Sequence, residues 1–369
     1  MISKILSVKL RIISTISILM VVYIHAYQVG IRYLEDNTII HEKINLSSFT
    51  QYFISNGVCA VAVPMLFLIS GFLFFNNFDG TLSGYTKKIQ RRFWSLLVPY
   101  LIWCTLGIGF LLICQLIPIM NSLLKDANFL PDIDKPVFLY NAGDYCNRLL
   151  FSPVPFQLWY IRDLMVFIII SPVIYWLLDQ LAVLFLFSLA CFWLLDLNYS
   201  LLHSKAALFF CLGAYIAKKH IYVYGRIADR YFVSMAIFWI GLVIMKSIAA
   251  FYIIIPIINV QSVIMVHILY KISEILGILV FWYSVDPKNR NDNSLFIKLT
   301  QFSFFIFAFH EPFQKVLIEI MRRLFGMDAY TLLVIYFFEP LIVVFFSLVV
   351  GYIMKRQLRK IYYIFTGGR

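Results

Sequence analysis

The stretch YFISNGVCAVAVPMLFLISGFLFF, residues 52–75, contains 24 residues and no charged side chain. About 20 apolar residues in a helix cross the hydrocarbon core of a bilayer. A membrane-spanning β-strand is about half as long, and its side chains alternate between apolar and polar. This stretch therefore predicts a membrane-spanning α-helix.

The whole chain has the composition of such a segment. Of its 369 residues, 62% are hydrophobic and 14% are charged. A soluble domain is about half apolar and about a quarter charged, and one core cannot hold so large an apolar excess. The composition excludes a soluble globular protein, a disordered chain and a disulfide scaffold. We expect an all-α, polytopic membrane helix bundle.

Long apolar runs predict about ten transmembrane helices within a single membrane domain, residues 1–369, that carries no appended soluble domain. The fifth and sixth runs are short and could be tilted or half-inserted elements. The longest connection, about 119–155, is rich in proline and too short for a second domain. The ten runs are residues 12–30, 52–75, 93–118, 156–178, 181–195, 206–217, 231–252, 262–283, 299–320 and 331–354.

The N-terminus resembles a signal peptide, because Lys4, Lys9 and Arg11 precede an apolar run. However, His25, Tyr27 and Gln28 occupy the place of a small-residue cleavage site, so we expect a retained first helix. The net charge of +12 would suggest a nucleic-acid partner in a soluble protein. Here, basic loops on the cytoplasmic side explain it, and their distribution predicts cytoplasmic termini and no nucleic acid.

The six cysteines do not suggest a redox framework. Five of them lie in apolar runs, Cys146 lies in the long polar connection, and the sequence contains no CxxC pair. We therefore expect neither a metal site nor a structural disulfide.

Ionisable side chains at bilayer depth are costly and usually face a cavity or a partner. His267, Lys271 and Glu274 follow at i, i+4 and i+7, so they share one helix face. The other polar groups in or beside apolar runs are His25, Gln28, Arg162, Asp163, His310, Glu311 and Glu339. Their number favours a polar cavity within the bundle.

Each group also has a purely structural interpretation. An intramembrane histidine can hydrogen-bond between packed helices. Lys271 and Glu274 can neutralise each other one turn apart. Arg162 and Asp163 can extend to the membrane surface behind the aromatic residues that precede them.

Six motifs, in this order and spacing, resemble acyltransferase family 3, whose members are integral membrane enzymes that mostly acylate surface carbohydrates. The resemblance extends from about Arg11 to Tyr352. The motifs are LRIISTISILMVVYIHAY (10–27), VPMLFLISGFLFF (63–75), KKIQRRFWSLLVPYLIW (87–103), FQLWYIRDLMVF (156–167), LFFCLGAYIAKKH (208–220) and LTQFSFFIFAFHEP (299–312).

The resemblance implies an acyl-CoA donor, usually acetyl-CoA, used from the cytoplasm as a substrate rather than as a tightly bound cofactor. It implies a hydroxyl acceptor on a surface or lipid-linked glycan, and a bacterial inner membrane location. By matching the motifs, it makes His25 the main catalytic candidate and His310 a second one. The family usually has an arginine where this chain has Ser14, and Arg11, one turn earlier, is the nearest substitute.

The chemistry agrees with these assignments. A neutral imidazole near pH 7 can accept the proton of an attacking hydroxyl, and Glu311 can tune a second proton carrier at His310. Lys87, Lys88, Arg91 and Arg92 can bind the phosphates of CoA, although they can also be a topology signal alone. Direct attack by the acceptor and relay of the acyl group across the membrane both remain open.

The competing interpretation is a transporter or flippase of polysaccharide or lipid-linked sugar. Transporters often show internal repeats and helices broken at mid-depth. We find no repeat, although Pro64, Pro172 and Pro256 could break helices. A signalling or scaffold protein would not need His25, His310 and a basic loop together.

Overall fold

The structure is a computed structural model that describes residues 3–27, 44–78, 80–127, 130, 135–199, 201–221, 227–252, 260–286 and 295–368. Within these ranges the chain forms helices and no β-strand. The all-α prediction is therefore confirmed for the described residues. Gln28, which we expected to face a cavity, lies outside them.

The α-helices are Lys4–His25 (α1), Leu46–Tyr52 (α2), Ala62–Phe75 (α3), Leu82–Arg92 (α4), Val98–Leu116 (α5), Pro118–Asp126 (α6), Ala142–Leu150 (α7), Trp159–Ile169 (α8), Ser171–Gln180 (α9), Ala182–Leu194 (α10), Ser204–Lys218 (α11), Asp229–Tyr252 (α12), Val260–Ser284 (α13), Leu295–Leu299 (α14), Ser303–Phe325 (α15), Ala329–Gln357 (α16) and Arg359–Thr366 (α17). Short 3₁₀ or π-helical turns join some of them, including Phe53–Val58 (η1), Phe93–Leu97 (η3) and Phe156–Leu158 (η5).

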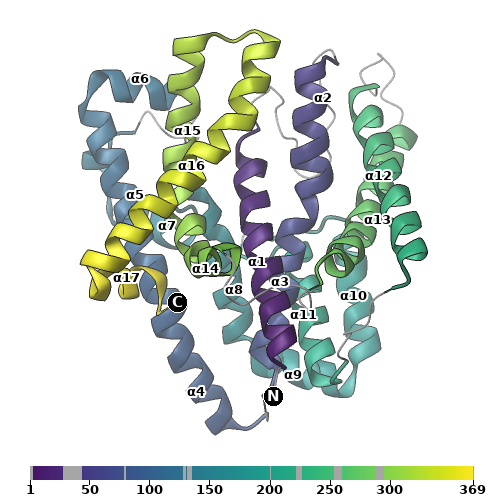
Figure 1. Cartoon of the computed structure of the whole chain (residues 1–369). Coiled ribbons are helices and arrows are strands. Elements are labelled where there is room, and N and C mark those ends of the chain that lie inside the picture. Colours follow the sequence, from purple (N-terminus) through teal and green to yellow (C-terminus); the bar gives the residue numbers. More distant parts are fainter. Residues whose placement is uncertain are drawn as a thin grey trace.

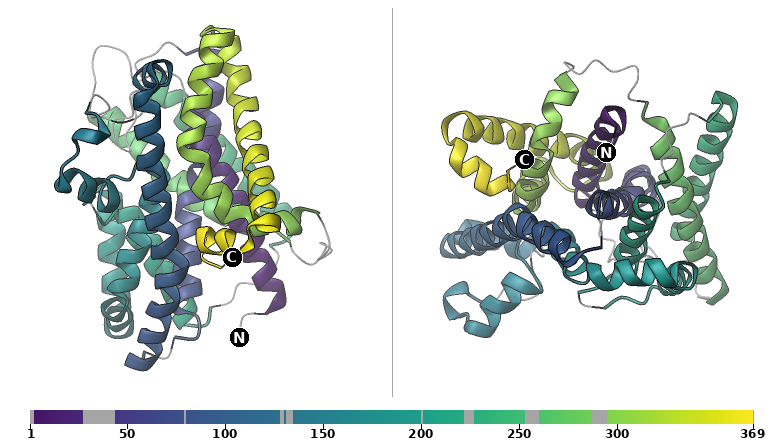
Figure 2. Two further views of the ribbon diagram at one scale, coloured as in Figure 1. Left: turned by 90° about the vertical axis from the view of Figure 1, so that its left-hand side faces the viewer. Right: turned by 90° about the horizontal axis from the view of Figure 1, so that it is seen from below.

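Helix α1 runs through the middle of the bundle (Figure 1). Helices α5, α15 and α16 stand on one side of it, and α12 and α13 stand on the other (Figures 1 and 2). The N-terminus and α4 lie at the same end of the molecule. The central position of α1 brings its last residue, His25, into contact with elements from distant parts of the chain.

Close packing of α3 against α11 explains the glycines in two of the sequence motifs. A Cβ atom at Gly71 would lie 2.0 Å from the carbonyl oxygen of Phe210, and one at Gly213 would lie 2.0 Å from that of Leu68. Only glycine allows the two backbones to approach so closely. This contact anchors α11 beside the centre of the bundle.

Six helices in the described ranges are long and apolar enough to cross a membrane, or seven if the bent pair Phe156–Ile169 and Ser171–Gln180 forms one span. The predicted runs 181–195, 206–217 and 299–320 are helical but do not meet this test. The count of ten is therefore not confirmed, and the cytoplasmic location of the termini remains a prediction.

The long connection at 119–155 contains α7 and most of α6. Pro118 stands in the first turn of α6, where its missing N–H costs no hydrogen bond. Helix α7 begins with a capping box in which Asn141 and Asp144 each accept a hydrogen bond from the other's backbone N–H.

Candidate active site

His25, the last residue of α1, meets α15 and η5. Its ring centroid lies 5.4 Å from that of His310 and 6.0 Å from that of Phe156. Its Nδ1 lies 4.0 Å from Oε1 of Glu311. The structure therefore brings the three predicted catalytic candidates, His25, His310 and Glu311, into one cluster.

A break in α15 creates this cluster. Glu311 has non-helical backbone angles of φ −97° and ψ 139°, and Pro312 follows it. Because proline has no N–H, the carbonyl four residues earlier, at Ala308, loses its helical partner. Nε2 of Gln157 donates to that carbonyl at 3.0 Å and to the carbonyls of Phe307 and Glu311 at 3.3 Å each. Gln157, which we did not single out in the sequence, thus stabilises the break.

His310 presents an unprotonated nitrogen inside the cluster. Its Nδ1 lies 3.1 Å from the carbonyl oxygen of Ile306, which can only accept, so Nδ1 carries the proton. Nε2 of His310 and Oε1 of Glu311 are buried and have no hydrogen-bond partner among the described residues. Both atoms can therefore form a hydrogen bond with a bound molecule.

Gln314 ties α1 to α15 and α16 beside His25. Its Nε2 donates to the carbonyl oxygen of Val22, one turn before His25, at 3.0 Å and to Oε2 of Glu339 at 2.9 Å. Gln314 and Glu339 are fully buried. Glu339, expected as an intramembrane ionisable group, therefore supports the position of α1.

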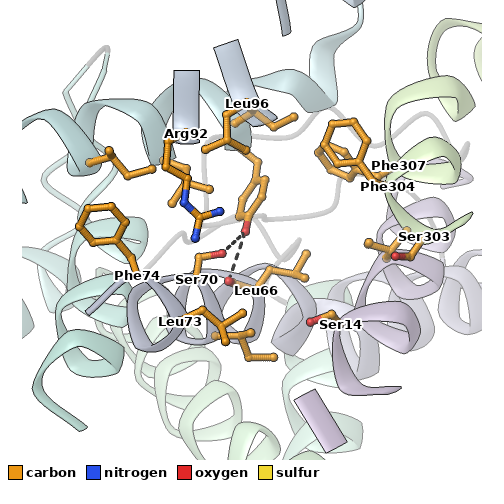
Figure 3. A pocket seen from close by; sticks show the side chains of 16 residues that line it. Ser14, Leu66, Ser70, Leu73, Phe74, Arg92, Leu96, Ser303, Phe304 and Phe307 are labelled. Carbon is orange, nitrogen blue, oxygen red and sulfur yellow. Dashed lines mark hydrogen bonds between the residues drawn. The ribbon is translucent and has the colours of Figure 1, made fainter. Parts of the chain in front are cut away.

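A cavity of about 270 Å³ lies in the bundle (Figure 3), and none of His25, His310 and Glu311 lines it. Phe307 lines it, and the ring of Phe307 contacts that of His310 at 6.2 Å. Arg92 lies on the opposite side of the cavity from Phe307 in Figure 3. The cavity is lined by Ser14, Ile18, Leu66, Ile69, Ser70, Leu73, Phe74, Arg92, Leu96, Tyr160, Ile161, Leu164, Ile168, Ser303, Phe304 and Phe307.

The structure separates the four basic candidates of α4 and also places Arg11. Arg92 lines the cavity, whereas Lys87 and Arg91 are exposed and are not among its lining residues. Lys88 donates to the carbonyl oxygens of Phe74 and Asn76 at the end of α3. Arg11 is also exposed, while Ser14 lines the cavity.

Arg162 and Asp163 do not extend to the membrane surface, so that interpretation is wrong. Their relative exposures are 7% and 0%. Arg162 donates to Oδ1 of Asp163 from Nε at 3.0 Å and from Nη2 at 2.8 Å, and it also donates to the carbonyl oxygen of Phe151. The second carboxylate oxygen, Oδ2, contacts Nδ1 of His203. We did not select His203 from the sequence. The one signal there is its position directly before the start of α11.

His267, Lys271 and Glu274 share one face of α13, as predicted, but that face meets α11 and the loop after α10. Lys271 and His267 both pair with Asp196. Glu274 pairs with Lys205, 3.2 Å away. The interpretation in which Lys271 and Glu274 neutralise each other is therefore wrong. None of the three lines the cavity described above.

A comparison with known protein families finds a match to an acyltransferase domain over residues 10–356. No curated protein and no solved structure matches the chain. The match covers nearly the whole chain and includes every residue of the histidine–glutamate cluster and of the cavity lining. Together with its long apolar helices, this match shows that the chain belongs to acyltransferase family 3 and is a membrane acyltransferase.

Proposed function

We propose that the protein is an acyl-CoA-dependent O-acyltransferase that transfers an acyl group, acetyl in our proposal, to a hydroxyl of a surface or lipid-linked glycan in a bacterial inner membrane. The observation that carries this proposal is the meeting of His25, His310 and Glu311, together with a cavity that Arg92 lines and whose lining residue Phe307 contacts His310. The donor enters as a substrate and leaves as CoA.

The cavity supports a donor site. A guanidinium pairs with phosphate through two parallel hydrogen bonds, and Arg92 is the basic side chain that lines the cavity. The many aliphatic and aromatic lining residues suit the pantetheine arm of CoA. In this arrangement Arg92 holds a phosphate and the thioester extends past Phe307 towards His25.

The cluster supports general base catalysis. Unprotonated His25 accepts the proton of the acceptor hydroxyl as its oxygen attacks the thioester carbonyl carbon. The C–S bond then breaks, and the proton passes to the departing thiolate to give CoA. The Glu311 carboxylate faces the imidazolium that forms and stabilises its charge. This step describes direct attack by the acceptor, and relay of the acyl group across the membrane before the acceptor is modified is the other route.

One observation favours the alternative of a polysaccharide or lipid-linked sugar transporter. Helix α15 is broken at Glu311, and α8 and α9 are bent by 63° at their junction. Broken helices beside polar groups are typical of transporter binding sites. The unpartnered atoms of His310 and Glu311 favour the enzyme, because they place hydrogen-bonding groups for a reacting substrate at the break in α15.

The substitution His25→Ala tests the proposal. Cells that carry this variant should produce their surface polysaccharide in normal amounts but without acyl groups, as measured by mass spectrometry. His220→Ala, which changes an exposed histidine, is the matched control and should retain acylation. Normal acylation in His25→Ala contradicts the catalytic role. A reduced amount of polymer with normal substitution supports transport instead.

A further inference from the structure

A second imidazole–carboxylate pair lies beside the catalytic cluster. Nδ1 of His203 is 2.5 Å from Oδ2 of Asp163, and Oδ1 of Asp163 accepts two hydrogen bonds from Arg162. Asp163 is fully buried, whereas the side chain of His203 is 36% exposed. The charges of Asp163 and Arg162 compensate each other. Of these three side chains, the imidazole of His203 is the one that reaches a surface.

The pair fixes which nitrogen of His203 is available. An ionised carboxylate only accepts hydrogen bonds, so Nδ1 carries the proton and the neutral ring keeps its lone pair on Nε2. The backbone around the ring is also held in place. Oδ1 of Asn198 accepts hydrogen bonds from the backbone N–H and the hydroxyl of Ser204, the first residue of α11. His203 is therefore a preorganised hydrogen-bond acceptor.

Two aromatic residues connect this pair to His25. Phe156 and Trp159 are one helical turn apart where η5 joins α8. Phe156 contacts the ring of His25 at 6.0 Å, and Trp159 contacts the ring of His203 at 4.8 Å. Phe156 is 54% exposed. Each imidazole thus contacts one of two aromatic side chains that lie one turn apart.

The donor cavity lies against a different face of α8 from the one that meets His203. Tyr160, Ile161 and Leu164 line that cavity, whereas Trp159 and Asp163 face His203. The start of α8 therefore separates the cavity from Trp159 and His203, and His25 contacts Phe156, one turn before Trp159.

We infer that His203, Trp159 and Phe156 form an acceptor subsite for the hydroxyl-bearing ring of a sugar. Nε2 of His203 accepts a hydrogen bond from one ring hydroxyl, and the two aromatic faces pack against the apolar C–H face of the ring. This inference rests on the proposed function and names where its acceptor binds.

The charges around the subsite favour an uncharged, hydroxyl-rich ring over an anion. Arg162 is compensated by Asp163, and Lys205, the next cation along α11, pairs with Glu274. A phosphate or carboxylate would bring only lone pairs to the lone pair of Nε2, whereas a hydroxyl brings a proton to it.

The test uses the full-length protein in detergent, radiolabelled acetyl-CoA, and methyl glucoside, methyl galactoside and methyl mannoside as acceptor probes. His203→Gln removes the imidazole, yet its amide can still donate to Asp163. We expect the acceptor KM to rise on the order of tenfold, the value of one lost hydrogen bond. The acetyl-CoA KM and the acceptor-independent hydrolysis of acetyl-CoA should remain unchanged.

Trp159→Ala should raise the acceptor KM in the same way, and Trp176→Ala, which changes an exposed tryptophan of α9, is its matched control. An unchanged acceptor KM in both His203→Gln and Trp159→Ala overturns the inference, as does a parallel loss of hydrolysis, which would indicate a structural role. Hydrolysis by the wild type without transfer to any of the three probes also overturns it. The proposed function fails separately, if His25→Ala retains transfer.

Discussion

Nδ1 of His25 and Oε1 of Glu311 lie 4.0 Å apart, at the point where the end of α1 meets the break in α15. This separation is an ion-pair distance and is longer than a hydrogen bond. The carboxylate is therefore placed to stabilise a positive charge that develops on His25 during the reaction.

Glu311→Gln should reduce turnover on the order of 100-fold, the usual contribution of a group that assists proton transfer. The glutamine keeps the shape of the side chain but removes the charge that faces the imidazolium. The acetyl-CoA KM should stay the same, because Glu311 does not line the cavity. Steady-state kinetics of the purified protein measure both quantities.

Glu319→Gln is the matched control, since Glu319 lies two turns further along α15 and pairs with Arg322 and Arg323. Equal losses of turnover in the two variants would show that Glu311 has no special role.

Arg92→Gln should raise the acyl-CoA KM about 10- to 100-fold, because a hydrogen bond to a charged group contributes about 1.5–3 kcal/mol. Arg91→Gln should leave the KM close to the wild-type value, since Arg91 is exposed and does not line the cavity. The two residues are neighbours in sequence, so this pair separates a phosphate contact from a general effect of basic charge. Equal KM values for both variants would contradict the donor site.

Gln157→Leu should lower the free energy of unfolding by about 1–3 kcal/mol, because buried carbonyl groups at the break would lose their donor. It should also lower turnover, because those hydrogen bonds hold the segment that carries His310 and Glu311. Thermal unfolding in detergent and kinetics on the same preparation provide the two measurements. Gln301→Leu, which removes an exposed contact to Lys355, is a suitable control. Wild-type stability and turnover in Gln157→Leu would contradict the role of these hydrogen bonds.

Asp144 should make the stability of α7 depend on pH. The ammonium of Lys135, followed by the backbone N–H of Asn141, holds the pKa of Asp144 below its ordinary value. A carboxyl whose pKa is lowered by folding stabilises the folded state above its unfolded pKa of about 3.9. That contribution is lost as the pH falls through the lower folded pKa.

Asp144→Asn should therefore reduce amide protection in residues 142–150 at pH 7, measured by hydrogen exchange, and the difference from wild type should disappear in strong acid. Lys135→Met removes the largest cause of the lowered pKa of Asp144. The pH range over which the ionised carboxylate stabilises α7 should therefore become narrower. If the difference in amide protection between Asp144→Asn and wild type persists unchanged in strong acid, ionisation of Asp144 is not its cause.

Local sequence patterns predicted some features of the site and not others. The FHEP motif placed His310 and Glu311 together, and the proline after them explains the break. Gln157 could not be selected in advance, because the carbonyls that it satisfies are about 150 positions away in the chain. His203 could not be selected for the same reason, since its partner Asp163 lies 40 positions away, in α8.

Ion pairs also depend on partners that are distant in the chain and that local spacing does not predict. Lys271 and Glu274 are one turn apart, so local spacing suggested that they neutralise each other. The structure pairs them with Asp196 and Lys205 instead, because the loop after α10 and the start of α11 bring these two side chains to the buried Lys271 and Glu274.

Composition and apolar run length by themselves determined the membrane class and the helical fold of this protein, because burial of apolar surface and backbone hydrogen bonding act over a few turns of chain. The order of residues in the six motifs carried the resemblance to the family. Only the tertiary structure decided which polar groups meet. A buried charge or hydrogen-bonding group must find its partner wherever the helices bring one within about 3 Å, and sequence spacing does not determine that position.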